Sequence, residues 1–377
     1  MVNFHRDIQK QIENKLFKHK VIILYGARQV GKTTIIKKIL EKNNLHSAYF
    51  DCEDPGVRDS FENANILQLK SLLVDLKFII FDEAQKIKNI GQTLKLIHDH
   101  LPKIQIIASG SSSFDLANKI VEPLTGRKYE FVLYPISITE LLKIYNRVEV
   151  KNFLSLILRF GNYPDILKSS ELQKPEILKE LTKSYLFKDI FIFQDLRNPE
   201  LLQKLLQNLA LQIGQEVSYH ELGVKLGVNE ATISRYIDLL EKAFVIFKLS
   251  ALSQNPRTEI HKKKKIYFYD LGIRNAIIQN FNNLELRNDI GAMWENFCII
   301  ERKKFLSKLQ KTPNQYFWRT YSQSEIDYIE EENGNFYPYE FKWNTKKKFK
   351  LPKSFSEKYQ YKNFKIISPD NFFDFVC

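Results

Sequence analysis

The sequence feature that most constrains the fold is the segment from Gly26 to Thr33, which reads GARQVGKT. It matches the pattern of a phosphate-binding loop (P-loop), in which two glycines are followed by a lysine and a threonine. An apolar run at residues 21–25 precedes it, as expected for a buried parallel strand, and residues 33–42 have the apolar spacing of a helix. Because loop N–H groups and the helix dipole would both face a bound phosphate, these three elements predict an anion site.

The residues expected to contact the nucleotide are consecutive. Lys32 is expected to reach the β- and γ-phosphates, and Thr33 to offer its hydroxyl to Mg²⁺, so ATP and Mg²⁺ are the predicted cofactors. Arg28 occupies a variable position and is expected to point away from the phosphates. The predicted nucleotide-binding residues are Gly26, Ala27, Arg28, Gln29, Val30, Gly31, Lys32, Thr33 and Thr34.

A second signal lies about fifty residues downstream, where the apolar run 78–81 ends in Asp82 and Glu83. This is a Walker B pattern, in which Asp82 would hold the Mg²⁺ shell and Glu83 would polarise the attacking water as general base. An apolar run that ends in two acids is also what a strand meeting solvent looks like. The upstream P-loop favours the catalytic interpretation.

A further apolar run, residues 104–108, ends in a serine-rich stretch. In parallel α/β sheets the ligand lies beyond the carboxyl ends of the strands, so Ser109 or Ser111 is predicted to meet the γ-phosphate or its water. Serines in this stretch are equally suited to cap a following helix. Different serines can serve the two roles, so both interpretations stand.

Several short segments, taken together in this order, resemble a group of prokaryotic AAA-type ATPases. The resemblance implies that Ser109 is a sensor residue and that Arg127 is a γ-phosphate-sensing or finger arginine, which suits an always-charged guanidinium. From the residues alone, Arg127 is a surface arginine after a turn. The segments that carry the resemblance are the P-loop, FDEAQ at 81–85, ASGSS at 108–112, and LTGR at 124–127 followed by LYP at 133–135.

The middle of the chain is helical in pattern over residues 138–212, and residues 213–255 then have the spacing of a winged helix. Gly223 would permit close helix approach, Gly227 would make the turn, and Ile233 would bury the second helix. Residues 243–249 are predicted to form the β-wing. If this unit binds DNA, the contact residues are Asn229, Thr232, Ser234 and Arg235. The alternative is a winged helix used only for packing between domains.

The last third contains an acidic trio and a lysine. The run of four lysines at 262–265 marks a connection before a predicted strand at 266–270. Glu295 lies on a predicted helix and Asp327 on a predicted strand. Glu340 and Lys342 lie on a further strand, where a spacing of two places both side chains on one face.

This arrangement resembles the core of PD-(D/E)XK nucleases, and the ATPases resembled above often carry a C-terminal domain of unknown function with such a core. The resemblance implies that Asp327 and Glu340 hold one or two Mg²⁺, with Glu295 supporting the metal or its water. Lys342 would orient the water or steady the developing phosphate charge. The alternative is an acidic, solvated strand edge, and an intact quartet shows capacity for cleavage rather than turnover.

Composition narrows the partners and the setting. The formal charge is +13, with about half of the excess in the last third, which favours a polyanionic partner and most simply DNA. A lysine-rich solvated surface would give the same total. The three cysteines are widely separated, which predicts a reducing, cytoplasmic setting, and no apolar run approaches a membrane span.

The predicted fold class is α/β, with four regions. They are an AAA-like P-loop domain with a parallel sheet (1–137), a helical lid (138–212), a winged helix (213–255) and a PD-(D/E)XK-like domain (256–377). The leading hypothesis is Mg²⁺-dependent ATP hydrolysis coupled to binding or cleavage of DNA. Its rivals are an ATP-driven switch or partner-binding protein with a catalytically silent nuclease-like domain, and a DNA-binding protein in which ATP controls access. The oligomeric state is left open, a homo-oligomer included.

Overall fold

A computed structural model describes residues 4–43, 45–110, 123–191, 198–253, 264–320, 324–346 and 349–377. They fall into two compact units. The N-terminal unit holds residues 5–135 with 242–244, and the C-terminal unit holds residues 136–241 and 245–377 with the first few residues. The predicted boundary after residue 137 lies close to the boundary between the units. The three regions predicted beyond it form one compact unit.

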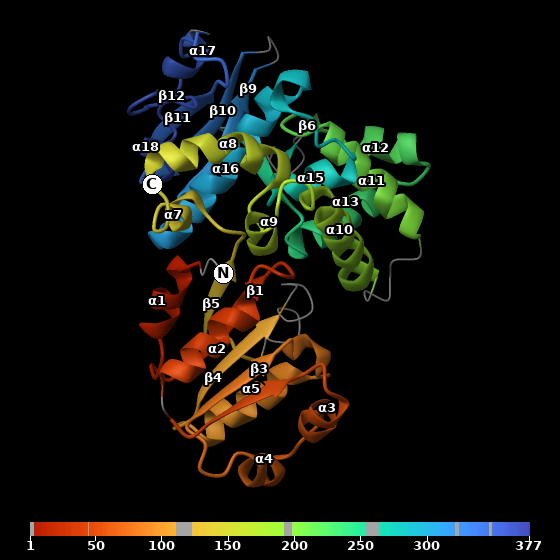
Figure 1. The fold of residues 1–377 in the computed structure, drawn as a ribbon, viewed down its shortest axis with the longest axis vertical. Helices are drawn as coiled ribbons and strands as arrows, with labels where there is room; N and C mark the ends of the chain where they lie inside the picture. The colour runs from red at the N-terminus through yellow and green to blue at the C-terminus, as the bar shows by residue number, and fades with distance from the viewer. Residues whose placement is uncertain are drawn as a thin grey trace. The chain divides into compact units, whose positions relative to one another are not determined.

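The N-terminal unit is built on a five-stranded sheet in the order β2-β3-β4-β1-β5, with every neighbouring pair parallel. The apolar runs of the sequence become its buried strands, and the predicted parallel sheet is confirmed. The strands are β1 (Val21–Gly26), β2 (Ser47–Asp51), β3 (Phe78–Asp82), β4 (Gln105–Gly110) and β5 (Lys128–Leu133), of which Figure 1 labels all but β2.

Strand order decides which sequence motifs meet in this unit. Strand β4 lies between β1 and β3, so the chain that follows each of these three strands emerges at the same edge of the sheet. Helix α2 packs on β1, β3 and β4. The helices are α1 (Asp7–Glu13), α2 (Lys32–Lys42), α3 (Pro55–Phe61), α4 (Ile66–Leu72) and α5 (Ile90–His100), with a short 3₁₀ turn at Ala84–Lys86.

The C-terminal unit contains a seven-stranded mixed sheet in the order β12-β11-β10-β9-β7-β8-β6. The predicted β-wing forms part of β7, which is an internal strand between β8 and β9 rather than an exposed wing. This pairing joins the predicted winged helix and nuclease-like domain. The strands are β6 (Glu216–Val217), β7 (Ile246–Ala251), β8 (Lys264–Phe268), β9 (Asn314–Arg319), β10 (Glu325–Glu332), β11 (Asn335–Phe341) and β12 (Lys365–Ile367).

Helices cover this sheet and extend from it. The long helix α16 packs against β8 and β11, and α8 packs against α15 and α16. No helix in the described parts of the chain is long and apolar enough to cross a membrane. The helices are α7 (Ile138–Leu141), α8 (Arg147–Phe160), α9 (Pro164–Lys168), α10 (Lys174–Phe191), α11 (Pro199–Leu211), α12 (Tyr219–Leu226), α13 (Glu230–Lys242), α15 (Leu271–Ile277), α16 (Ile290–Lys308), α17 (Lys353–Ser356) and α18 (Phe373–Val376).

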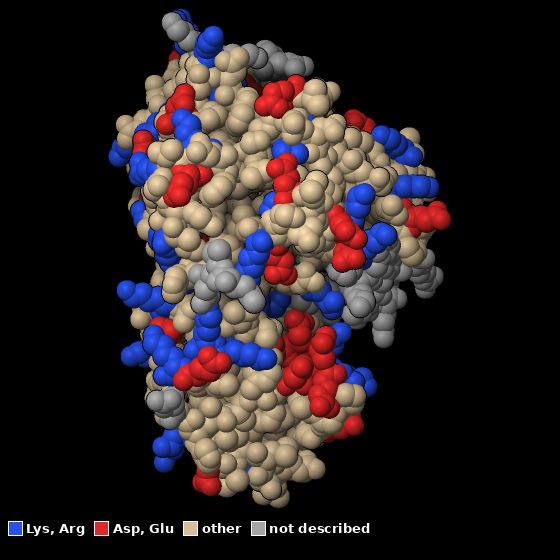
Figure 2. All heavy atoms as spheres, viewed as in Figure 1, with Lys and Arg blue, Asp and Glu red and all other residues tan. Residues whose placement is uncertain are grey.

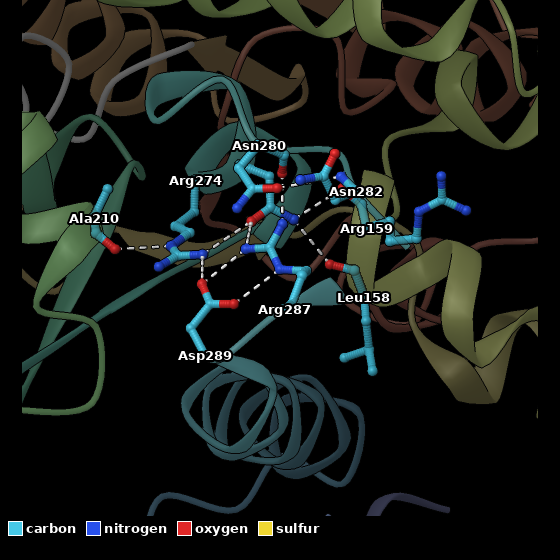
Figure 3. Close-up of polar contacts among 9 residues, drawn as sticks. Leu158, Arg159, Ala210, Arg274, Asn280, Asn282, Arg287 and Asp289 are labelled. Carbon is cyan, nitrogen blue, oxygen red and sulfur yellow. Dashed lines mark hydrogen bonds and ion pairs between the residues drawn. The ribbon is translucent and has the colours of Figure 1, made fainter. Parts of the chain in front are cut away.

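A buried network of ion pairs and hydrogen bonds connects several of these helices. Figure 3 shows the guanidinium groups of Arg274 and Arg287 directed at the carboxylate of Asp289, at 2.5 and 2.8 Å. Arg274 also donates to the Ala210 carbonyl at the end of α11, at 2.8 Å. The amide of Asn275 donates to carbonyls in the last turn of α8. Each of these groups has a partner, which offsets the cost of burying it at the junction of α8, α11, α15 and α16.

Candidate functional site

The predicted phosphate-binding loop connects the carboxyl end of β1 to the N-terminus of α2. Gly31, the residue before the helix, has a φ of 98°, in a region that favours glycine. A Cβ placed on Gly26 would lie 2.4 Å from the carbonyl oxygen of Leu133, so a larger residue does not fit there. Both glycines of the motif are therefore required by the geometry of the loop.

Lys32 lies inside this loop and is only 5% exposed. Its Nζ donates to the carbonyl oxygens of Gly26 and Ala27, each at 2.9 Å. The same Nζ lies 4.0 Å from Oε1 of Glu83. The ammonium group is thus held at the N-terminus of α2, where an anion would bind.

Asp82 ends β3 and collects hydroxyl donors from three other segments. Its Oδ2 accepts from Thr33 Oγ1 at 2.7 Å and from the hydroxyl of Tyr49 at 2.6 Å. Its Oδ1 accepts from Ser109 Oγ. The structure therefore brings together Thr33, Asp82 and Ser109, which the sequence predicted, and adds Tyr49. Ser111, the alternative to Ser109, lies outside the described residues.

Tyr49 is a site residue that sequence reasoning missed. It lies on β2, which pairs with β3 in parallel, and its ring reaches forward along the sheet to the Asp82 carboxylate. Burial, the hydrogen bond to Asp82 and the nearby negative charges raise the pKa of its phenol, so the hydroxyl remains a donor. Only the pairing of β2 with β3 brings the two residues together, and the local sequence does not specify that pairing.

Glu83, the predicted general base, adopts a left-handed conformation with φ 50°. This conformation is uncommon for a residue other than glycine, and such strain tends to persist where it serves a site. Its Oε2 accepts from Gln85 Nε2 at 2.5 Å, and its Oε1 faces Lys32. The carboxylate is therefore held beside the loop by contacts on both oxygens.

Arg6 contacts the phosphate-binding loop and is a second site residue that sequence reasoning missed. It is 9% exposed, and its Nη1 donates to the Val30 carbonyl at 2.7 Å while Nη2 donates to the Tyr134 carbonyl. In a trans peptide the C=O and the following N–H point in opposite directions. With the Val30 carbonyl turned toward Arg6, the N–H of Gly31 points away from Arg6.

The structure does not bring Arg127 to this site. Arg127 precedes β5, next to the pairing of Lys128 with Val21 at the start of β1. The P-loop follows the other end of β1, on the order of 17 Å away along the strand. Nε of Arg127 instead donates to Asp99 at 2.9 Å. The expectation that Arg127 senses the γ-phosphate therefore fails within a single chain, because the motif order did not reveal at which edge of the sheet it would lie.

In the segment predicted to be a helix-turn-helix, α12 ends at a turn that leads into α13. Gly227 ends α12 in a left-handed conformation with φ 71°. A Cβ on Gly223 would lie 2.7 Å from the Val228 carbonyl oxygen, and Ile233 is fully buried. The exposed Asn229 caps α13 by accepting from the Thr232 N–H at 2.8 Å.

In the C-terminal unit the structure brings the predicted acidic residues together at one end of β10 and β11. The register that pairs Tyr328 with Tyr339 places Asp327 opposite Glu340 one step further along. The Phe341 N–H donates to Oδ2 of Asp327 at 2.8 Å. Both carboxyl groups are almost fully buried.

Charge within this acidic cluster is only partly compensated. Burial, and then the charges of Glu295 and Glu340, raise the pKa of Asp327 well above its usual range. Burial also raises the pKa of Glu340, although Lys342 opposes this from 2.5 Å. The buried Oε2 of Glu340 has no hydrogen-bond partner. Carboxylate oxygens left in this condition suit a hard divalent cation.

Glu295 and a second lysine complete the cluster. Glu295 Oε1 accepts from Lys265 Nζ at 2.9 Å and from the Tyr267 hydroxyl at 2.5 Å. Lys265 was expected to belong to a connecting charge run, but it lies on β8 and is 2% exposed. Among the described residues, no three His, Cys, Asp or Glu side chains are arranged as a metal-binding group. The carboxylate oxygens of Asp327 and Glu340 are of the kind that a divalent cation accepts as ligands.

A cavity of about 470 Å³ lies in the C-terminal unit among α10, α11 and α15. Its walls are mainly apolar, with Leu202, Leu206 and Ile277 among them, and lysines and glutamines stand at its rim. It contains none of the residues of the nucleotide site or of the acidic cluster, so its volume gives no guide to the chemistry.

Three family models match consecutive parts of the chain. An AAA domain matches residues 18–142, and two domains of unknown function, DUF8612 and DUF4143, match residues 151–284 and 290–369. The P-loop, Asp82, Glu83 and Ser109 all lie within the first match. Residues 18–142 thus form an AAA-type P-loop ATPase-like domain.

Similar proteins come from archaea and bacteria. An uncharacterized protein of Methanocaldococcus jannaschii is 26% identical over 326 residues, which cover 79% of this chain and 73% of that protein. An uncharacterized protein of Mycobacterium tuberculosis is 28% identical over 342 residues, or 89% of this chain and 73% of that protein. A solved structure, the Walker-type ATPase PABY2304 of Pyrococcus abyssi, aligns with a TM-score of 0.49 at 16% identity, covering 73% of this chain and 96% of that one.

Proposed function

We propose that the N-terminal unit binds ATP together with Mg²⁺ and hydrolyses it. The observation that carries this proposal is the carboxylate of Asp82, which accepts from both Thr33 and Ser109 beside Lys32 and Glu83. Oxygen ligands from a threonine hydroxyl and an aspartate suit Mg²⁺. When bound, Mg²⁺ would neutralise phosphate charge and orient the γ-phosphate.

Each residue of the site has one role in this proposal. The N–H groups of residues 26–34 bind the phosphate oxygens, and Lys32 neutralises the β- and γ-phosphates. Thr33 and Asp82 hold the metal and its water shell. Glu83 accepts a proton from the attacking water, and Ser109 fixes the orientation of the Asp82 carboxylate.

The test compares ATP turnover and nucleotide affinity in the full chain and in two variants. Lys32→Ala should lose both binding and turnover. Glu83→Gln should keep nucleotide affinity while turnover falls by about 10²–10⁴-fold, because the general base is gone. Lys42→Ala, an exposed lysine at the end of the same helix, is the matched control and should change neither. Unchanged turnover in Lys32→Ala and Glu83→Gln would overturn the proposal.

A second proposed function concerns the acidic cluster, which we assign to a divalent cation and to cleavage of a nucleic-acid phosphodiester bond. Asp327 and Glu340 would hold the metal, which would lower the pKa of a bound water and polarise the phosphate. Lys342, 2.5 Å from Glu340, would steady the negative charge that develops on the phosphate. The buried, partnerless Oε2 of Glu340 is the observation that favours this function.

The favoured nucleic acid is DNA, and its proposed contact is the turn between α12 and α13 with Asn229, Thr232, Ser234 and Arg235. The net charge of +13 supports a polyanionic partner. On the face in view in Figure 2, however, Lys and Arg are interspersed with Asp and Glu on both units rather than gathered in one basic surface. ATP hydrolysis would then control access to DNA or its cleavage.

A DNA-nicking assay with Mg²⁺ or Mn²⁺, with and without ATP, separates the remaining alternatives. Metal-dependent nicking that disappears in Glu340→Ala and Lys342→Ala, and persists in the exposed-surface control Glu357→Ala, would support cleavage. Absence of nicking with either metal would favour the rival function, in which ATP sets the state of a switch and the acidic cluster is silent. DNA binding without nicking would favour the DNA-binding alternative.

A further inference from the structure

Lys265 is a buried cation that neither the sequence pattern nor the roles above explain. It lies on β8 with 2% of its surface exposed. Its Nζ lies 2.9 Å from Glu295 Oε1 and 2.5 Å from Glu325 Oε1. Burial lowers the pKa of its ammonium, but Glu295, Asp327 and Glu325 together raise it above the ordinary value. Lys265 therefore places a cation that is paired with two carboxylates inside the acidic cluster.

The charge balance around Lys265 leaves room for one divalent cation. When a bound cation has displaced the protons of Asp327 and Glu340, so that all six groups are ionised, the four carboxylates and two ammonium groups carry two net negative charges. Arg319, which lies 3.7 Å from Glu325, is balanced by Glu216 at 3.8 Å. Isolated charge is costly in a buried site, so a deficit of this size favours binding of a doubly charged ion. The six groups are Glu295, Glu325, Asp327, Glu340, Lys265 and Lys342.

The contacts of Glu295 set it apart from the two proposed metal ligands. Its Oε1 accepts from both Lys265 and the fully buried Tyr267, at 2.9 and 2.5 Å. Glu340, by contrast, keeps one buried oxygen without any partner. Two donors from β8 thus hold Glu295, whereas Glu340 still needs a partner.

We propose that Lys265 is a positioning residue that holds Glu295 and Glu325 out of the metal's ligand set, so that the cluster takes one divalent cation on Asp327 and Glu340. The inference rests on the proposed metal site but does not require cleavage. It replaces the expectation that Glu295 supports the metal. Lys265 lies on β8, which pairs with β6 and β7. These two strands come before α12 and after α13, so Lys265 connects the metal site to the sheet region next to those helices.

The test is an Mn²⁺ titration of the nucleotide-free full chain, followed by electron paramagnetic resonance of free and bound ion. Subtracting the binding curve of Asp327→Asn isolates the ion held by the cluster, and the wild-type difference should be one Mn²⁺. Lys265→Met removes the charge and keeps the length of the side chain. It should raise Mn²⁺ affinity at the cluster about tenfold or admit a second ion, because a nearby positive charge is removed and Glu295 and Glu325 lose the cation that they share.

Two further variants keep the test decisive if Lys265→Met folds poorly. Glu295→Gln should weaken Mn²⁺ binding at the cluster far less than Asp327→Asn does, because it removes a nearby negative charge but no ligand. Arg302→Met removes a cation from α16, the helix that carries Glu295. Arg302 pairs there with Glu330 on β10, at 2.7 and 2.8 Å, and its loss should leave Mn²⁺ affinity at the cluster unchanged.

The outcomes distinguish this inference from the proposal on which it rests. If Glu295→Gln loses Mn²⁺ as Asp327→Asn does, Glu295 is a ligand and the role of Lys265 is overturned. Unchanged or weaker binding by a folded Lys265→Met overturns it as well. If wild-type protein and Asp327→Asn bind Mn²⁺ identically, the metal site itself is absent and both proposals fail.

Discussion

Asp82 in the N-terminal unit and Asp327 in the C-terminal unit are both buried aspartates on β-strands, but their surroundings are opposite. Asp82 accepts hydrogen bonds from three hydroxyl groups. Asp327 faces the carboxylates of Glu295 and Glu340, and burial together with their charges raises its pKa. The difference teaches that the first site is organised by protein donors before any ligand binds, whereas the second is under electrostatic strain that a cation would relieve.

Among the residues of the organised site that the sequence did not reveal, Arg6→Ala has the largest predicted effect. The variant loses hydrogen bonds from a guanidinium to the carbonyls of Val30 and Tyr134, so the Val30 peptide is no longer held. Since a hydrogen bond that involves a charged group contributes about 1.5–3 kcal/mol, ATP affinity should fall about 10–100-fold, as measured by titration with a fluorescent nucleotide. Turnover at saturating ATP should change much less than affinity.

The matched control for Arg6 is Arg58→Ala. Arg58 also donates to backbone carbonyls, those of Cys52 and Glu53, but it lies outside the loop. It should leave ATP affinity within a factor of about two. If both arginine variants lose affinity equally, Arg6 acts through general stability and not through the loop.

A smaller effect is predicted for Tyr49→Phe. Loss of one hydrogen bond, worth about 0.5–1.5 kcal/mol, leaves Asp82 with fewer donors and should raise the Mg²⁺ concentration for half-maximal turnover about 2–10-fold. Turnover at saturating Mg²⁺ should be nearly unchanged. Tyr25→Phe is the control, because its hydroxyl donates to Glu130 at 3.0 Å and not to Asp82. Equal Mg²⁺ requirements in the wild type and Tyr49→Phe would show that Asp82 is organised without the tyrosine.

The smallest effect is predicted for Arg127→Ala in dilute, monomeric protein. Arg127 forms an exposed pair with Asp99, and such pairs contribute about 0–1 kcal/mol. Turnover should therefore stay within a factor of two. A large loss that appears only as protein concentration rises would show that Arg127 acts on the nucleotide of a neighbouring copy.

The two sites also differ in how much of them could be predicted from sequence. The P-loop and the Asp82-Glu83 pair are short continuous motifs, each of which directly follows an apolar strand sequence. Their positions at the edge of the sheet could therefore be predicted. Arg6 and Tyr49 could not, because they reach the site through the tertiary fold and carry no local pattern. The position of Arg127 likewise depends on where β5 begins in the sheet. The order of the motifs along the sequence does not determine this.

In the C-terminal unit the same limit applies more strongly. Glu340 and Lys342 were predicted to share one face of a strand from their spacing of two; the structure brings their charged groups to 2.5 Å, although β11 ends at Phe341. Lys265 was hidden in a run of four lysines that resembled a solvated connection. The pairing of β7 with β9 joined regions predicted to be separate domains, because strand partners are chosen by tertiary packing and not by a strand's own sequence.

The pH dependence of stability should reveal the strain in the acidic cluster. Raised pKa values mean that Asp327 and Glu340 bind protons in the folded chain at a pH where the unfolded chain has released them. The free energy of unfolding of the C-terminal unit should therefore fall as pH rises from the ordinary carboxyl pKa through the raised values. Added Mn²⁺ should reverse this fall, because it binds the ionised form.

The most direct test of the contrast between the two sites is the stability of Asp82→Asn and Asp327→Asn at neutral pH without divalent cations. Hydrogen exchange, which reports the two units separately, measures each change. Asp82→Asn should destabilise the N-terminal unit by about 1–3 kcal/mol, because a charged acceptor of three hydroxyls is lost. Asp327→Asn should stabilise the C-terminal unit, because a repelled buried charge is removed. A loss of stability in both variants would contradict the account.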